Sequence, residues 1–232
     1  MNRQSITQFF RHALVFTGTI AALAACEGAG GSSAGLGRNP NGAGKVVTGE
    51  SCEGHASDQY CIGVKYVVYK DSSGTAVSSA ADAAENVRVT NGIWKQCGIA
   101  FQIEKYEEVN PADFDLPYGG PSAESQTQAS RRAFAEEGSF LVVTTGAWGV
   151  TKNAWTNAPG VAPYGAIMEG GIAKGYGEIY AHELGHYLGL DHVSDPRNLL
   201  SPVIAPNSVN MTDDQCANSR AMAKDFWGKM LR

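Results

Sequence analysis

The sequence lacks any concentration of positive charge. Its 232 residues carry 18 Lys and Arg against 23 Asp and Glu, a formal net charge of −5. The longest basic run is Arg131-Arg132, so nothing predicts a surface that follows nucleic acid phosphates, and we expect no nucleic acid partner. The 28 glycines have no three-residue period, which excludes collagen. The hydrophobic fraction of 43% excludes a disordered chain and predicts one sizeable core.

The N-terminal apolar run is too short to cross a bilayer. It extends over about 13 residues, from Ala13 to Ala25, roughly half of a membrane span. It follows the charges of Arg3 and Arg11 and ends in small residues, which is typical of a signal peptide. The residues up to Cys26, Leu23-Ala24-Ala25-Cys26, resemble the bacterial lipobox, whose Cys becomes the lipidated first residue of the mature protein. An ordinary secretory signal with Cys after its cleavage site is the alternative.

The lipobox interpretation accounts for the odd number of cysteines. The chain has five, and if Cys26 carries lipid, four remain: Cys52, Cys61, Cys97 and Cys216. In an oxidising compartment four thiols predict two disulfides, with three possible connectivities. We favour Cys52 with Cys61, which closes a short local loop, and Cys97 with Cys216, which ties the early part of the domain to its last helix.

Composition divides the chain into three parts. Residues 1–25 are the expected lipoprotein signal peptide, and residues 26–45 form a Gly-rich tether without hydrophobic periodicity. Residues 46–232 show no repeat and no second break, so they predict one domain. Glu27 is not the Asp that favours inner-membrane retention. We therefore expect the lipid to hold the protein in the bacterial cell envelope, at the outer membrane. We also expect a monomer.

Hydrophobic periodicity predicts an α+β domain, with a long helix packed on a twisted mixed sheet. A long glycine- and proline-rich stretch, 146–171, is expected to be mostly loop and edge strand. The predicted strands are 62–70, 99–107 and 139–145; the predicted helices are 75–96, 121–137, 175–190 and 212–230, the last with Thr212 as its N-cap.

Three histidines within eleven residues predict a metal site. On a helix, His182 and His186 are four residues apart and present their imidazoles to one point, with Glu183 next to them. His192 could not join them on a continuous helix, but Gly189 can take a left-handed conformation that ends the helix and turns the chain back. Three neutral imidazoles and one open position are typical of one catalytic Zn²⁺.

The spacing of these residues, HExxHxxGxxH, is the signature of the metzincin metalloproteases, which the chain resembles. The residues that follow, Val193 to Pro202, are similar to the segment after the third ligand in matrixins. Leu200 stands at the Met-turn position, where the family has methionine, and the two differ little in volume. Val193 is not the residue that labels the matrixin, astacin or serralysin groups, so the subfamily stays open. The resemblance is close over residues 182–202 and extends loosely over 46–232.

The resemblance implies a metzincin-like zincin catalytic domain with an active-site helix and a C-terminal helix. It also implies a zinc-dependent endopeptidase, in which Glu183 assists the attack of a zinc-bound water on the peptide bond. An extended peptide or protein substrate would pair with an edge strand within 160–172, and segment 201–209 would form one wall of the pocket. A catalytically inactive zinc-binding lipoprotein that acts in binding is the alternative, and the presence of Glu183 favours the enzyme.

Other residues have simpler interpretations. Trp148 and Trp155 are expected to pack in a loop, with a substrate subsite as the alternative. His55 is expected at the surface of a disulfide loop, and Asp191 is expected to be a solvated acid at a turn. A matrixin-type cysteine switch is not present, since Cys52 is expected to pair with Cys61. The sequence does not indicate whether the protein binds structural Ca²⁺.

Overall fold

The computed structural model describes residues 46–52, 56, 58–120, 124–150, 152–173 and 176–232. The predicted signal peptide, the tether, Cys26 and His55 lie outside the described residues. Within them, no helix is both long and apolar enough to span a membrane.

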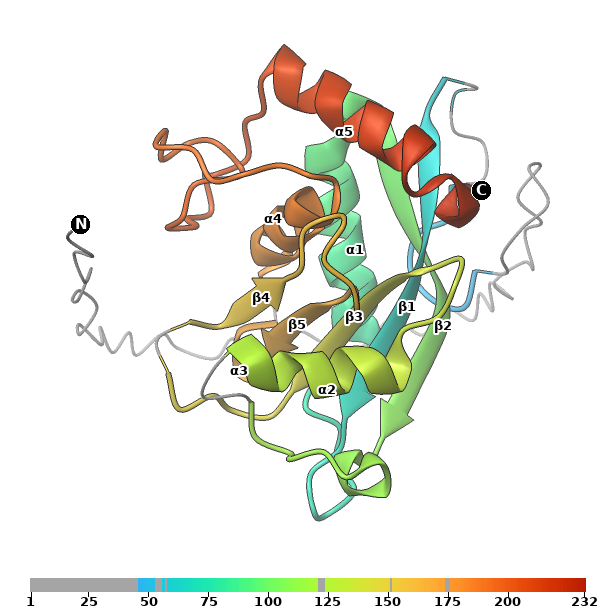
Figure 1. Cartoon of the computed structure of the whole chain (residues 1–232), viewed down its shortest axis with the longest axis vertical. Coiled ribbons are helices and arrows are strands. Elements are labelled where there is room, and N and C mark those ends of the chain that lie inside the picture. Colours follow the sequence, from blue (N-terminus) through green and yellow to red (C-terminus); the bar gives the residue numbers. More distant parts are fainter. Residues whose placement is uncertain (1–45, 53–55, 57, 121–123, 151, 174–175) are drawn as a thin grey trace, which may run out of the picture. The chain divides into compact units, whose positions relative to one another are not determined.

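The described residues form five strands and five α-helices in mixed order along the chain (Figure 1). The strands are β1 (Tyr60–Tyr69), β2 (Ile99–Val109), β3 (Phe140–Thr145), β4 (Ala154–Thr156) and β5 (Ala166–Glu169). The helices are α1 (Ala80–Trp94), α2 (Glu124–Phe134), α3 (Gly170–Ala173), α4 (Gly177–Tyr187) and α5 (Asp213–Asp225). Short 3₁₀ helices cover Lys95–Cys97, Pro111–Phe114 and Gly228–Met230.

The strands form one mixed sheet in the order β2-β1-β3-β5-β4. β1 pairs in parallel with β2 and β3, and β3 pairs in parallel with β5. β4 runs antiparallel to β5, with Ala154 opposite Met168 and Thr156 opposite Ala166. The short antiparallel strand β4 therefore forms one edge of the sheet.

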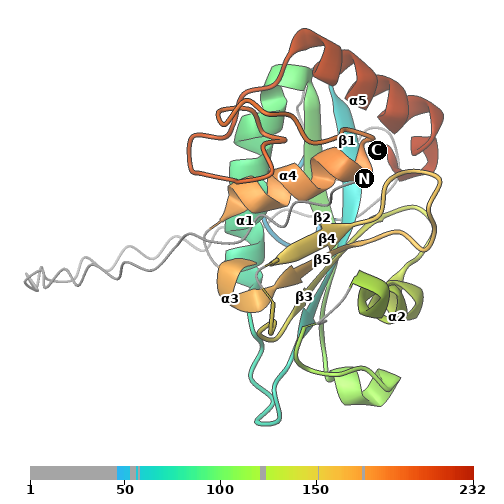
Figure 2. The same ribbon diagram turned by 60° about the vertical axis from the view of Figure 1, so that its left-hand side comes forward.

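Helices cover both faces of this sheet. Figures 1 and 2 show α1 and α4 on one face and α2 on the other. Alternate β1 side chains follow this division: Val64 and Tyr66 belong to the larger core cluster under α1 and α4, and Val67 belongs to a second cluster with Phe134 of α2. Because successive strand residues point to opposite faces, a strand buried on both sides is almost continuously apolar, as the sequence of β1 is.

The α+β prediction is confirmed, with differences at element ends. α1 begins at Ala80 because Ser79 and Asp82 form a capping box, five residues after the predicted start. α5 begins after Thr212, the predicted N-cap, but ends at Asp225 instead of residue 230. The stretch 146–171 contains two strands, β4 and β5, which are too short to give a clear periodicity.

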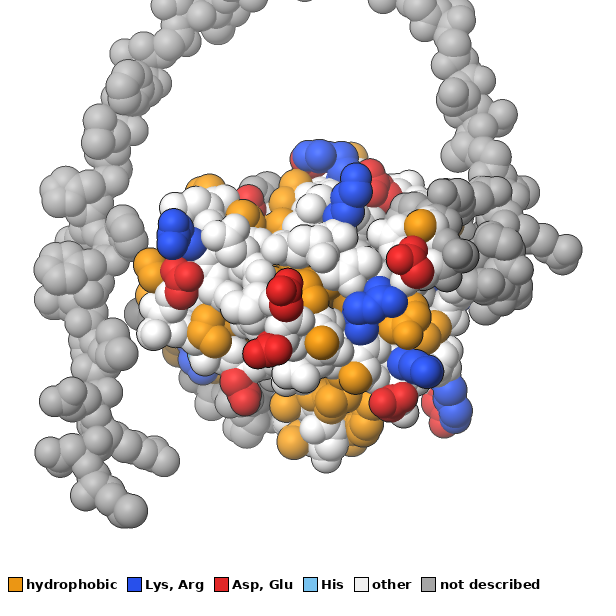
Figure 3. Space-filling model, turned by 90° about the horizontal axis from the view of Figure 1, so that it is seen from above, with side chains coloured by type: hydrophobic (Ala, Val, Ile, Leu, Met, Phe, Trp, Pro, Cys, Tyr) orange, Lys and Arg blue, Asp and Glu red, His pale blue; other side chains and the backbone are white. Residues whose placement is uncertain are grey.

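The face that carries α5 has no concentrated charge of either sign. Figure 3 looks onto this face from above and shows Lys and Arg side chains interspersed with Asp and Glu. On this part of the described surface, the arrangement agrees with the absence of basic runs in the sequence.

Candidate metal centre and cleft

α4 carries the first half of the candidate site and is fixed against α1. The indole Nε1 of Trp94 donates to the carbonyl oxygen of Ala181 at 3.1 Å, and the Thr90 hydroxyl donates to that of Gly177 at 3.3 Å. A Cβ atom at Gly177 would lie 2.4 Å from the Val89 side chain, so only glycine allows this close approach. The buried side chains of His182 and Glu183 therefore have a defined position.

The chain turns back at Gly189 as the sequence predicts. Gly189 has a φ of 78°, and its N–H donates to the carbonyl oxygen of His186 at 3.0 Å. The N–H of Leu190 donates to the carbonyl oxygen of Gly185, also at 3.0 Å, which completes a Schellman motif. This turn brings His192 back to the end of the helix.

The three histidines meet at their Nε2 atoms. The Nε2 of His182 lies 3.0 Å from that of His186 and 3.2 Å from that of His192, and the His186 and His192 atoms are 3.2 Å apart. Nitrogen ligands at 2.0–2.1 Å from a tetrahedral Zn²⁺ are roughly 3.3 Å apart. The spacing of the three nitrogens therefore fits a zinc ion with three protein ligands.

Backbone carbonyls orient two of the rings. The Nδ1 of His182 lies 2.7 Å from the carbonyl oxygen of Leu199, and the Nδ1 of His186 lies 2.8 Å from that of Leu190. A carbonyl oxygen can only accept, so each Nδ1 carries the proton of a neutral ring and each Nε2 carries a free lone pair. This arrangement of an oriented imidazole behind the metal position is common in zinc sites.

The surroundings keep the imidazoles neutral. Burial lowers the pKa of His182 to about 4, and the neighbouring His186 adds to the effect. Burial is also the main reason why the pKa values of His186 and His192 are lowered. A neutral imidazole is the form that binds a metal ion.

Glu183 lies beside the histidines and contacts the edge strand. Its side chain is buried, and the hydroxyl of Thr156 in β4 donates to its Oε2 atom at 2.5 Å. Burial raises the pKa of Glu183 to about 7, while the hydrogen bond from Thr156 acts in the opposite direction. Sequence reasoning did not identify Thr156, because a three-residue strand 27 positions before the motif gives no signal in the sequence.

Comparisons with known proteins identify the type of site. Residues 170–221, which include all three histidines and Glu183, match the family model of the matrixins. This segment of the chain is therefore similar to the matrixins. At the level of the family, this supports a zinc metallopeptidase.

Solved structures with similar folds are distant. A metalloproteinase-II from Bacteroides fragilis is 16% identical with a TM-score of 0.48, over 81% of this chain and 59% of that one. Archaemetzincin from Methanopyrus kandleri is 14% identical with a TM-score of 0.49, over 72% and 97%. A chaperone-substrate complex is 13% identical with a TM-score of 0.48, over 75% and 36%. The match thus spans less than two thirds of the Bacteroides metalloproteinase and of the chain from the chaperone-substrate complex. A search of curated protein sequences found no match.

The segment after His192 forms a closed turn, with Leu200 at the position where the resemblance implies a methionine. Leu200 is fully buried, and a Cβ atom at Gly185 of α4 would lie 3.2 Å from its side chain. The carbonyl oxygen of Leu200 accepts from the N–H of Val193 at 3.0 Å, which closes the segment between the third histidine and this turn. Leu200 is thus buried and packed against α4, while its role as an apolar floor under a metal ion stays a prediction.

A cleft of roughly 650 Å³ contains the three histidines and Glu183. Of the segment 201–209, which is predicted to form one wall, Pro202 and Ile204 line the cleft. The remaining lining residues come from segment 152–159, from α4 and the turn after it, and from α5: Lys152, Asn153, Ala154, Trp155, Thr156, Ala158, Pro159, Ile179, Gly189, Leu190, Asp191 and Met222.

The predicted position of the edge strand is wrong. Within 160–172, residues Ala166–Glu169 form β5, which lies between β3 and β4 and has no free edge in the described sheet. The edge is β4, a few residues earlier. Trp155 of β4 lines the cleft and stacks on the buried Trp148 with ring centroids 4.9 Å apart. Asp191 is exposed, as expected of a solvated acid at the turn.

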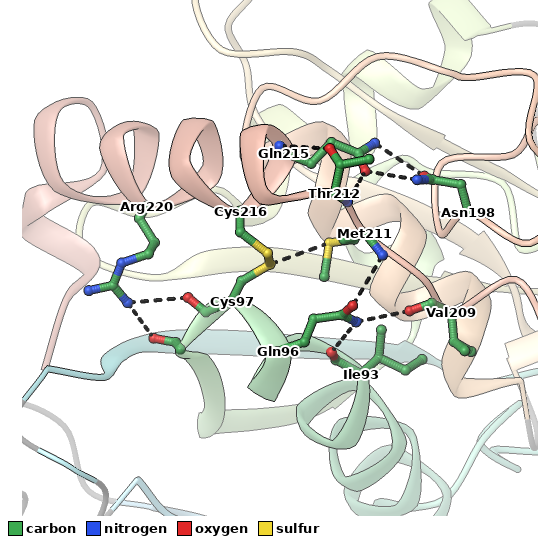
Figure 4. The surroundings of a disulfide bond; sticks show 11 residues. Ile93, Gln96, Cys97, Asn198, Val209, Met211, Thr212, Gln215, Cys216 and Arg220 are labelled. Atoms are coloured by element: carbon green, nitrogen blue, oxygen red, sulfur yellow. Dashed lines mark hydrogen bonds between the residues drawn. A yellow bond between two sulfur atoms is a disulfide. The ribbon is translucent and has the colours of Figure 1, made fainter.

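Both favoured disulfides are present, Cys52–Cys61 and Cys97–Cys216. Figure 4 shows the second, which joins the short 3₁₀ helix that follows α1 to the first turn of α5. Beside it, the Gln96 side chain donates to the carbonyl oxygen of Val209 at 2.9 Å and accepts from the N–H of Met211 at 3.1 Å. These contacts fix the segment that continues from the cleft wall into α5.

Replacing both Cys97 and Cys216 with Ala is expected to lower the free energy of unfolding by about 2–5 kcal/mol, because this disulfide links residues 119 positions apart. Urea unfolding of the zinc-loaded protein measures the loss. The matched control replaces Cys52 and Cys61, whose link spans only 9 positions and stabilises less in the chain-entropy description. A Cys97/Cys216 variant that is as stable as the control variant would contradict the expectation.

Proposed function

We propose that the protein is a zinc-dependent endopeptidase. The observation that carries the proposal is the meeting of three Nε2 atoms at 3.0–3.2 Å with a buried glutamate beside them, in a cleft bounded by a sheet edge. His182, His186 and His192 would hold the metal. When bound, Zn²⁺ supplies Lewis acidity, which polarises a carbonyl group and lowers the pKa of water.

Glu183 is the group that moves the proton. Its carboxylate accepts a proton from the attacking water and passes it to the amine that leaves when the peptide bond breaks. A general base works best when its pKa lies near the working pH, and burial places that of Glu183 at about 7. A bound cation would favour the ionised carboxylate, which is the form that accepts the proton.

The edge strand offers a place for an extended peptide. In the sheet formed by the described residues, β4 pairs with β5 and has no strand on its other side. The N–H of Glu169 donates to the carbonyl oxygen of Asn153, so Asn153 and Trp155 face β5 in the alternation of an antiparallel pair. The main-chain groups of Ala154 and Thr156 then face the cleft, where a peptide in extended conformation can add as a further strand.

The N-terminal sequence supports a proposal about the location of the protein. We propose that Cys26 carries lipid and that the Gly-rich residues 26–45 connect the peptidase, as a monomer, to a bacterial membrane, the outer membrane in a two-membrane envelope. The resemblance of residues 23–26 to a lipobox supports this. Mass spectrometry of the N-terminal peptide from membrane fractions tests it, because lipidation adds the mass of the acyl chains.

Removal of zinc is the direct test of the activity. The purified protein is expected to cleave a mixed library of quenched fluorescent peptides, to lose this activity after dialysis against 1,10-phenanthroline, and to regain it with one equivalent of Zn²⁺ but not of Mg²⁺. Elemental analysis follows the metal content. Cleavage by fully zinc-depleted protein, or no cleavage of any peptide by protein with one equivalent of zinc, would contradict the proposal.

A further inference from the structure

We propose that Thr156 is a positioning residue for peptide hydrolysis, which orients the Glu183 carboxylate through its hydroxyl group. The inference rests on the proposed function, since it concerns the residue that moves the proton. Its basis is the contact between two elements far apart in the chain: Thr156 Oγ1 in β4 lies 2.5 Å from Glu183 Oε2 in α4.

The hydrogen bond has one direction while the carboxylate is ionised. A carboxylate can only accept, so the single hydroxyl proton of Thr156 points to Oε2 of Glu183. Among the described residues, no other side chain donates to this carboxylate. Oε2 thus accepts from the protein, and we assign the proton of the attacking water to Oε1. The Thr156 hydroxyl therefore makes the two oxygens of the Glu183 carboxylate different: one accepts its hydrogen bond, and the other is assigned to the proton.

Thr156 is itself held on both sides. The Nη2 atom of the buried Arg131 in α2 donates to the carbonyl oxygen of Trp155 at 2.8 Å. On the other side, the Nδ2 atom of the buried Asn157 donates to the carbonyl oxygen of Pro163 at 2.8 Å. A β-branched side chain on a fixed strand has few χ1 positions. The hydroxyl is therefore in a fixed place before substrate binds, as orientation of a catalytic group requires.

The position of Thr156 joins two tasks. Its side chain contacts the base, while its main chain belongs to the edge on which we propose the substrate pairs. The same three-residue strand thus places the peptide and the proton acceptor relative to each other. Misplacement of a reacting group by about 1 Å costs up to 10²-fold in rate.

Kinetics of three variants test the inference. Thr156→Val keeps the shape and removes the hydroxyl; it is expected to lower kcat about 10- to 100-fold with KM changed less than about twofold. Thr156→Ser restores the hydroxyl and is expected to recover most of kcat. Thr144→Val removes another buried threonine hydroxyl from the same sheet, in β3, which β5 separates from β4; it does not line the cleft and is the matched control. Zinc affinity, measured by competition with a chromophoric chelator, is expected to stay unchanged in all three.

A second measurement does not depend on activity. In protein labelled with ¹³C at the glutamate carboxyl carbons, the Glu183 resonance is assigned by its loss in Glu183→Gln. It is expected to shift in Thr156→Val and to return in Thr156→Ser. The inference is overturned if Thr156→Val keeps the kcat of the wild type, leaves the resonance unshifted, loses zinc or fails to fold. It is also overturned if Thr144→Val loses as much kcat as Thr156→Val, or if Thr156→Ser does not recover kcat. An inactive wild type with the expected resonance shifts would overturn only the proposed function.

Discussion

Replacing Glu183 with Gln is expected to lower kcat/KM for peptide cleavage by about 10³-fold while zinc stays bound. The amide has the size of the carboxylate but cannot accept and return a proton, and general acid–base catalysis contributes typically 10²–10⁴-fold. The hydroxyl of Thr156 can still donate to the amide oxygen, so the local packing is kept. Steady-state kinetics with a cleaved peptide, together with zinc analysis of the same sample, measure both quantities.

The matched control for this variant is Glu178→Gln, an acid in the first turn of the same helix that does not line the cleft. It is expected to retain activity within about twofold, since it removes one charge without touching the base. Activity of Glu183→Gln within tenfold of the wild type, with zinc bound, would show that the proton is accepted by another group and would refute the assigned role.

Replacing His192 with Ala is expected to weaken zinc binding by about 10³-fold and to abolish cleavage. If roughly 12 kcal/mol of binding free energy is shared by three ligands, one ligand contributes about 4 kcal/mol, which corresponds to that factor. His192 tests the site best because its side chain is exposed and lies beyond the end of α4. Its removal therefore leaves the helix and the core intact. Titration of the metal-free protein with Zn²⁺ against a chromophoric chelator measures the affinity.

The control for this variant is the adjacent exposed residue, replaced in Asp191→Ala. It changes the same turn and the same cleft lining without removing a nitrogen ligand, so it is expected to bind zinc within about tenfold of the wild type. Equal zinc affinity of His192→Ala and the wild type would mean that two histidines hold the metal and that the turn at Gly189 has another purpose.

Local sequence was sufficient to predict that the three histidines come together. The four-residue spacing of His182 and His186 has meaning as soon as a helix forms, because helix geometry alone puts both on one side. Gly189 could be assigned to the turn because a left-handed residue at a helix end is a local property, and its φ of 78° agrees. The Cys97–Cys216 pair, in contrast, was the favoured one of three possible connectivities, and the packing of α5 against the 3₁₀ helix Lys95–Cys97 establishes it.

The sequence by itself determined the α+β class and the cluster of three histidines with Glu183 beside it, since each depends on periodicity or on spacing within about 20 residues. Only the tertiary structure decided which segment forms the sheet edge and that Thr156 reaches Glu183. β4 has only three residues, too few to show a periodicity. Its place is set by pairing with β5, by the hydrogen bond from Arg131 to Trp155, and by the hydrogen bond from Asn157 to Pro163 in the following loop. Contacts of this kind arise from packing and leave no local pattern, so the residue proposed to orient the base became visible only in the folded chain.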